Sequence, residues 1–168
     1  MTPILVTPPT VPVVQLLDMR DHLRVDHYDD DVRIMSIERA AVAHHDGWKG
    51  VLGRCIMPQT WRQDFTCWGK LRIAMPDASE FVVTYRDADG VWQPIEDFEA
   101  DIDGAGPYVE IDEAPSELFR VQYQCALPVE QLPAIQMAVK LYAETLYDGK
   151  DLPPAYHAII SALRWWTV

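Results

Sequence analysis

The sequence predicts an α+β fold, in which N- and C-terminal helices form a helical bundle and an antiparallel β-sheet subdomain is inserted between them. Three observations predict it. Apolar residues recur every three or four positions before residue 54 and after residue 131, β-formers dominate the stretch between, and Gly and Pro punctuate that stretch. With 168 residues, of which 49% are hydrophobic, the chain suits one domain, 1–168. Its expected parts are an arm (1–12), the bundle (13–54 and 131–166) and the β insert (55–128).

The first twelve residues carry four prolines, Pro3, Pro8, Pro9 and Pro12. Prolines at this density prevent a helix and favour an extended arm. Two states stay open, a disordered tail in an isolated subunit and an arm that becomes ordered on a neighbouring subunit. A first helix is expected over 13–24. Its partial apolar stripe is Val13 or Val14, Leu16, Leu17 and Leu23.

A longer helix is expected to start at the acidic run Asp29-Asp30-Asp31 and to stop at Gly53-Arg54. Acidic side chains at a helix start cap free N–H groups and complement the helix dipole. The apolar face steps by three and four residues through Ile34, Ile37, Ala41, His44, Trp48 and Val51. A strand-like segment, 55–61, follows, and its Pro58 indicates an edge strand or a strand entry.

Further strands are expected over 71–75, 81–85, 108–111 and 118–123, with a hairpin from 81–85 to Val91-Trp92 through the turn at 87–90. Together they predict one antiparallel sheet or a small barrel-like insert. Helix returns near Pro133 and ends at Asp148-Gly149. Pro153-Pro154 then opens a last helix, whose apolar side is Tyr156, Ile159, Ile160 and Leu163.

The charge balance is strongly acidic, with 14 basic residues against 26 acidic ones and a net charge of −12. Such a chain should repel duplex DNA, because DNA affinity is built on Lys and Arg. The three cysteines, Cys55, Cys67 and Cys125, are odd in number and widely spaced, which predicts free thiols in a cytosolic product. Neither a secretory signal nor an apolar run of roughly 20 residues is visible, so we expect no membrane partner.

Residues with possible site chemistry do not form a recognisable set. His44 and His45 are neighbours and point in different directions on a helix, while His22 and His27 are separated by a helix end. The segment 101–106 imitates a calcium loop with Asp101, Asp103 and Gly106, but its fifth position is alanine, so a hairpin turn is favoured. Nucleophile and phosphate-loop motifs are missing. We therefore expect no catalytic residue, metal or cofactor, and a protein that is not an enzyme.

The closing Trp165-Trp166 is open to two interpretations. The pair folds back on the domain's own core, or it anchors the chain in a partner's pocket, since tryptophan is enriched at interface hot spots.

The order of several segments resembles the head-to-tail connector (adaptor) proteins of long-tailed phages and gene transfer agents. The resemblance covers about Val13 to Arg164 and depends on order and spacing rather than on one motif. The first helix departs from the family's alanine-rich pattern, and neither the proline-rich arm nor the Trp pair can be transferred. The segments that carry it are 21–26 with the acidic turn after it, 53–62, 83–91, the helix from Pro133, and 152–164.

This resemblance implies a virion structural protein. It would form a ring, usually of twelve copies, beneath the portal, extend the DNA channel and offer a docking platform to stopper or tail-terminator proteins. Its partners would be itself, the portal protein, those neck proteins, and genome DNA that passes through the lumen without specific binding. It would be assembled in the bacterial host cytoplasm and reside in the virion neck. Docking on the portal would use the C-terminal segment, which here is Arg164, Trp165, Trp166, Thr167 and Val168.

The acidic composition fits that role, since a ring multiplies the charge of each subunit and an acidic lumen would let DNA slide without sticking. Two alternatives stay open. One is a tail-completion or terminator protein of the phage neck, which would be sheet-dominated and six-fold. The other is a small acidic ligand-binding module or enzyme, which would need convergent polar groups in a cleft.

Overall fold

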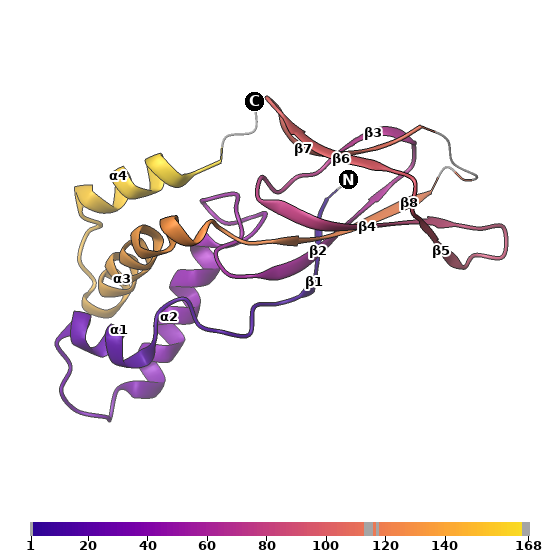
Figure 1. The fold of residues 1–168 in the computed structure, drawn as a ribbon. Coiled ribbons are helices and arrows are strands. Elements are labelled where there is room, and N and C mark those ends of the chain that lie inside the picture. The colour runs from indigo at the N-terminus through magenta and orange to yellow at the C-terminus, as the bar shows by residue number, and fades with distance from the viewer. Residues whose placement is uncertain (1, 113–115, 117, 166–168) are drawn as a thin grey trace. The chain divides into compact units, whose positions relative to one another are not determined.

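The computed structural model describes residues 2–112, 116 and 118–165, and it divides the chain into two compact units. The first unit comprises the described residues of 2–9 and 57–126 and holds the strands; the second comprises the described residues of 10–56 and 127–165 and holds the helices. Figure 1 shows the strands and the helices of the two units. The α+β class is confirmed, with helices mostly N- and C-terminal to a central β region.

In the helical unit, α1 (Leu16–Leu23) and α2 (Asp31–His45) precede the β region, and α3 (Leu132–Asp148) and α4 (Pro154–Leu163) follow it. A short 3₁₀ turn, η1 (Val129–Gln131), leads into α3. α2 lies beside α3, and their buried faces meet through Ile34 and Ala41 on one side and through Ile135, Ala138 and Val139 on the other. Gly149, with a φ of 72°, ends α3 as expected, because the left-handed conformation suits glycine.

In the strand unit, one antiparallel sheet has the order β1-β2-β8-β4-β5 and a second has the order β3-β7-β6. The expected single sheet or barrel was therefore wrong. The strands are β1 (Ile4–Thr7), β2 (Gln59–Phe65), β3 (Gly69–Arg72), β4 (Ala78–Arg86), β5 (Trp92–Ile95), β6 (Glu99–Asp103), β7 (Gly106–Ile111) and β8 (Phe119–Cys125).

The core of the strand unit is centred on β8, whose inward residues Phe119, Val121 and Tyr123 are all fully buried. Buried residues alternate with more exposed ones along this strand, which is the pattern of a sheet with one packed face. Gln63, also buried, ties the segment after β3 to this sheet. It accepts from the Tyr123 hydroxyl at 3.2 Å and from the Ala74 N–H at 2.9 Å, and donates to the Arg72 carbonyl at 3.3 Å.

The expected arm is extended, but part of it belongs to the chain's own sheet, since β1 pairs with β2. A tail disordered over its whole length was therefore wrong. The segment expected as a strand over 55–61 begins instead at Gln59, and Pro58 lies at its entry. β2 is an interior strand between β1 and β8, which explains why the proline stands before it.

The acidic start of α2 works differently from expectation. Asp30 occupies the N-cap position without a side-chain capping bond, and its carboxylate accepts from the Tyr147 hydroxyl at 2.7 Å. Asp31 lies 3.6 Å from the guanidinium of Arg20. These carboxylates therefore connect α2 to α3 and α1. The stripe proposed for α1 was also partly wrong, because Leu17 is 66% exposed while Met19 is fully buried.

Candidate partner-binding segment and its supports

The C-terminal segment expected to bind a partner follows directly on α4. Arg164 ends the helix, with its N–H donating to the Ile160 carbonyl at 2.9 Å, and its side chain is exposed. Trp165 is half-buried, and its N–H donates to the Leu52 carbonyl at 2.8 Å. Trp166, Thr167 and Val168 lie outside the described residues. Trp165 thus lies against its own helical unit, as the fold-back interpretation of the pair requires for this one residue.

A loop between residues 46 and 54 supports this segment. The guanidinium of Arg54 donates through Nη1 to the Leu163 carbonyl at 3.1 Å and to Gln131 Oε1 at 2.9 Å. Leu52 within the loop is fully buried and supplies the carbonyl that holds Trp165. The end of α4 is therefore fixed by main-chain and side-chain bonds to one loop.

This loop occupies residues that the sequence assigned to the long helix, so that boundary was wrong. α2 ends at His45, and Trp48 and Val51 lie beyond it. Gly47 has a φ of 76°, which suits glycine, and its N–H donates to the Arg54 carbonyl at 2.8 Å. Gly50 passes so close to the helix end that a Cβ there would lie 2.3 Å from the His45 carbonyl oxygen. Gly47 and Gly50 turn the chain back onto α2, and the spacing of apolar residues gives no sign of this turn.

An aromatic cluster joins α2, α3 and α4 inside the helical unit. His45 is fully buried, and its ring makes edge contacts with Tyr142 and Tyr156 at centroid distances of 5.3 and 5.5 Å. His44 stacks on Tyr142 at 4.2 Å. The three-and-four spacing predicts His44 on the apolar face, but His45 is the buried residue. Trp48 and Val51, which set the phase of that spacing, are not helical.

Both nitrogens of His45 have partners. Nδ1 lies 2.6 Å from the Ala41 carbonyl oxygen, so Nδ1 carries the proton, and Nε2 accepts from the Tyr156 hydroxyl at 3.0 Å. Burial lowers the pKa of His45 below its usual value, and the pKa of Tyr156 is raised to about 12 by the same cause. The ring is therefore neutral and oriented at pH 7, as suits a structural contact. Because both ring nitrogens of His45 are hydrogen-bonded, neither is available to bind a metal.

A hollow of 390 Å³ opens between the end of α1 and the end of α3. Its charged side chains are matched with one another. His22 Nε2 lies 3.2 Å from Glu144 Oε2, and the Lys150 ammonium lies 2.5 Å from Asp148 Oδ2. Arg24 also lines it. Acids and bases that already contact each other favour a surface ion-pair cluster over a binding site for a charged small molecule.

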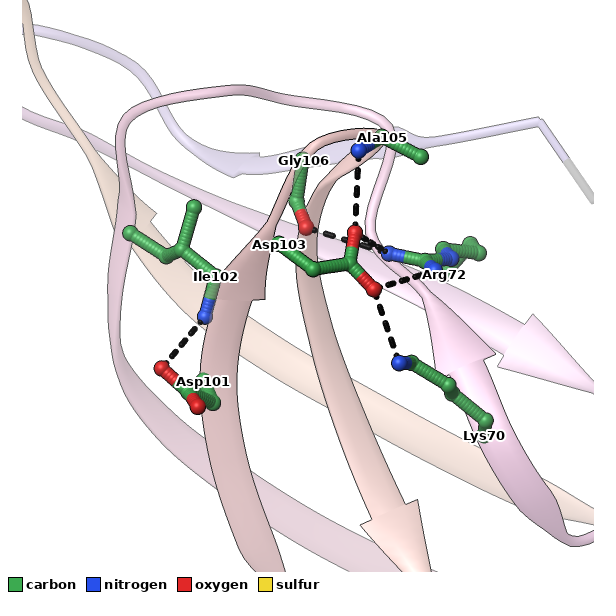
Figure 2. A network of polar contacts seen from close by, with 7 residues as sticks. All are labelled: Lys70, Arg72, Asp101, Ile102, Asp103, Ala105 and Gly106. Carbon is green, nitrogen blue, oxygen red and sulfur yellow. Dashed lines mark hydrogen bonds and ion pairs between the residues drawn. The ribbon is translucent and has the colours of Figure 1, made fainter.

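The segment that imitates a calcium loop forms the hairpin between β6 and β7, as expected. Figure 2 shows Asp103 at its centre. Its carboxylate receives two bonds from the Arg72 guanidinium at 2.5 and 2.6 Å, one from the Lys70 ammonium at 2.7 Å, and one from the Ala105 N–H at 2.9 Å. These donors hold the pKa of Asp103 well below its usual range. The carboxylate is saturated by the chain's own donors.

The second turn, at 87–90, is also built as expected. Asp87 Oδ1 accepts from the N–H groups of Asp89 and Val91 at 3.0 and 2.8 Å, and Gly90 adopts a φ of 82°. Among the described residues, no three His, Cys, Asp or Glu side chains are arranged to hold a metal ion. Within the same residues, no helix has the length and apolar character needed to cross a membrane. Cys55, Cys67 and Cys125 form no disulfide, as expected.

No protein-family model matches the sequence. A search of curated proteins also finds no match. Among solved structures, the chain is similar to a chain from the neck of an empty gene transfer agent particle whose structure was computed with C6 symmetry. The two share 21% sequence identity and superpose with a TM-score of 0.75, over 100% of this chain and 97% of the other.

At this level of identity the similarity establishes a shared fold. It extends over both units, because it covers the whole chain. The family that the sequence resembles includes proteins of gene transfer agents, and the fold is shared with a neck protein of such a particle. Membership in the adaptor family stays a prediction.

Proposed function

We propose that this chain is a structural protein of the neck of a phage-like particle, where it acts as a head-to-tail adaptor. The observation that carries the proposal is the similarity over the full chain to a neck protein of a gene transfer agent particle. Two lines of argument, the order of sequence segments and the shared fold, point to the same group of particles. Function does not follow from fold alone, so the site has to support it.

The described residues support a role in protein contact better than one in chemistry. The polar groups with shifted pKa values are all engaged in contacts within the chain, as His45 is with Ala41 and Tyr156. Asp103 is likewise saturated by Arg72 and Lys70. A catalytic group needs a free lone pair or proton aimed at a substrate. We infer a non-enzymatic protein without cofactor or metal.

In the proposed assembly, twelve copies of this chain form a ring beneath the portal. The solved neck has C6 symmetry, and both a ring of six and a ring of twelve are compatible with a six-fold axis. Between residues 57 and 126 the chain has 5 basic and 14 acidic residues, a difference of −9 out of the total of −12. An acidic ring of this kind would let genome DNA pass without binding it.

Docking on the portal is assigned to the segment that starts at Arg164. Trp165 has the attributes of an interface anchor, since its backbone is fixed by the Leu52 carbonyl while its ring is only half-buried. The opposite end of the ring would then receive the stopper or tail-terminator protein. The particle neck is the proposed location.

Native mass spectrometry of the chain with the portal ring of the same particle tests this proposal. A complex that carries six or twelve copies of the 19.2 kDa chain on one portal is expected. The variant Trp165→Ala keeps the main-chain bond to Leu52 and should weaken docking about tenfold, which corresponds to about 1.4 kcal/mol. Trp68→Ala is the matched control, because Trp68 is 53% exposed and lies in the strand unit.

Failure of the folded wild-type chain to assemble on the portal contradicts the adaptor role. Assembly on a completed tail tube in place of the portal identifies the tail-terminator alternative. If Trp165→Ala binds as well as the wild type, the assigned docking segment is wrong, while the proposed ring is not contradicted.

A further inference from the structure

β1 is an edge strand without the usual protection against pairing. It pairs with β2 on one side, and among residues 2–112, 116 and 118–165 no strand pairs with its other side. Its apolar side chains are exposed on both faces, with Ile4 at 46%, Leu5 at 42% and Val6 at 44%. The free edge of a strand presents a row of unpaired N–H and C=O groups to any other strand.

The other three sheet edges carry devices that discourage strand addition. β5 contains Pro94, which has no N–H to offer. β3 exposes Lys70 and Arg72, and β6 exposes Glu99 and Asp101. Charged side chains and prolines on edge strands are common means by which proteins avoid edge-to-edge association. Residues 4–7 contain neither, so β1 is the sheet edge open to a partner strand in the part of this unit that the structure describes.

We propose that β1 is a self-association site, at which a second copy of this chain adds its own β1 as an antiparallel strand. Charge argues for a second copy at this place. The strand unit is strongly acidic, so copies repel one another over most of its surface. The segment from Thr2 to Pro12 has no charged residue, and two copies can approach there with the least repulsion.

The sequence of β1 also fixes the form of this contact. An antiparallel pair of identical strands is related by a two-fold axis, so it closes at two copies. Opposite residues of an antiparallel pair point to the same face, so the axis lies between two copies of one residue, Leu5 or Val6. Pro3 and Pro8 flank the strand and limit the added ladder to the four residues of β1. The contact is therefore small, and the dimer is weak and reversible.

This inference does not depend on the proposed function, because it concerns the free chain without a portal. In the unassembled subunit, pairing of two β1 strands would bury an apolar edge that otherwise favours aggregation. The contact should also strengthen with salt, because added ions screen the repulsion between acidic copies while leaving apolar contact intact.

Sedimentation equilibrium of the purified full-length chain tests the inference, over protein concentrations from about 10 μM to about 1 mM, a range suited to weak interfaces. We expect a monomer–dimer equilibrium that shifts toward the dimer in high salt. Val6→Lys places two like charges across the pair and should weaken the dimer at least tenfold. The matched control is Val82→Lys, the same change at a residue of β4 that is 54% exposed, which should leave the equilibrium unchanged.

Amide hydrogen exchange locates the contact. Protection of residues 4–7 should rise with protein concentration in the wild type and not in Val6→Lys. Circular dichroism checks the fold of each variant, and Leu5→Lys replaces Val6→Lys if the latter does not fold. A wild type that is monomeric throughout, a Val6→Lys variant that dimerises as well as the wild type, or direct growth to rings of six or twelve without a two-copy species would overturn the proposal.

Discussion

The Tyr156 hydroxyl donates to Nε2 of the fully buried His45 across 3.0 Å, and this bond joins the last helix to α2. The two residues are 111 positions apart in the chain. Tyr156 is also the buried residue of α4, whose larger apolar side chains Ile159, Ile160 and Leu163 are only half-buried. Since the candidate docking segment follows α4 directly, this contact helps to position Trp165.

Removing the Tyr156 hydroxyl should destabilise the helical unit. Tyr156→Phe keeps the ring contacts but leaves Nε2 buried without a partner, which costs about 1–3 kcal/mol. Urea unfolding followed by near-UV circular dichroism measures the loss. Tyr142→Phe is the matched control, because Tyr142 contributes to the same cluster through its ring. Equal effects of the two changes would show that the hydroxyl bond is not the stabilising element.

The stability of the helical unit should fall on mild acidification because of His45. Burial lowers the folded-state pKa of His45 below the usual 6.5, so the unfolded chain binds the proton more readily. Stability from this group is therefore complete above pH 6.5 and is lost as the pH falls through the lower folded pKa. Denaturation between pH 7.5 and 5 should show this decline, and His45→Gln should flatten it. An unchanged slope in the variant would assign the decline to other groups.

Glu38 should give the opposite dependence. Its carboxylate is buried and accepts from the Val14 N–H at 3.4 Å, and burial raises its folded-state pKa above 4.5. The folded chain then holds the proton more tightly, so stability from this group is present at low pH and is lost as the pH rises through the raised pKa. Glu38→Gln keeps an acceptor for Val14 and should abolish this dependence. Just above pH 4.5 the stability of the variant should no longer fall with rising pH on account of this group, because the opposing slope is gone.

The Asp103 hairpin predicts a measurable titration. Arg72 and Lys70 bind its carboxylate, so NMR should find Asp103 ionised well below the usual carboxyl pKa of 3.8. Any stability from this pair of bonds is present above pH 3.8 and is lost as the pH falls through the lower folded value. Arg72→Met should raise the pKa of Asp103 toward its usual value, whereas Lys49→Met, in the helical unit, should not. A pKa that does not respond to Arg72→Met would mean that the hairpin bonds are not formed in solution.

Local signals explain which parts of the fold could be predicted. The hairpin turns at 87–90 and 103–106, the end of α3 and the start of α4 depend on residues close in sequence, such as Asp87, Gly149 and Pro154. Those predictions were confirmed. β1 and β6 were missed as strands, because their pairing depends on partners far along the chain and because β6 alternates acidic residues on an exposed edge.

The contacts that hold the candidate docking segment in place were the least predictable feature of the fold. The segment itself could be named from the family resemblance and its tryptophans, but the loop at 46–54 could not be seen in a periodic pattern. Trp48 and Val51 continued the three-and-four spacing by coincidence, and the true helix ends where Gly47 and Gly50 turn the chain back. The same shift in phase puts His44 in place of His45 on the expected apolar face. Contacts such as that of Arg54 with Leu163 depend on a distant helix.

Two glycine substitutions separate steric from conformational requirements around this loop. Gly50→Ala would place a Cβ 2.3 Å from the His45 carbonyl oxygen, so the main chain must move, and a loss of about 3 kcal/mol is expected. Gly149→Ala meets no atom within 4 Å but must keep a φ of 72°, which costs about 1 kcal/mol. Urea unfolding ranks the two, and exchange protection of the Trp165 N–H reports on the loop directly. Because Leu52 holds that N–H, Gly50→Ala should expose it to exchange while Gly149→Ala should not. Equal losses in both variants would mean that the close approach at Gly50 does not hold the C-terminal segment in place.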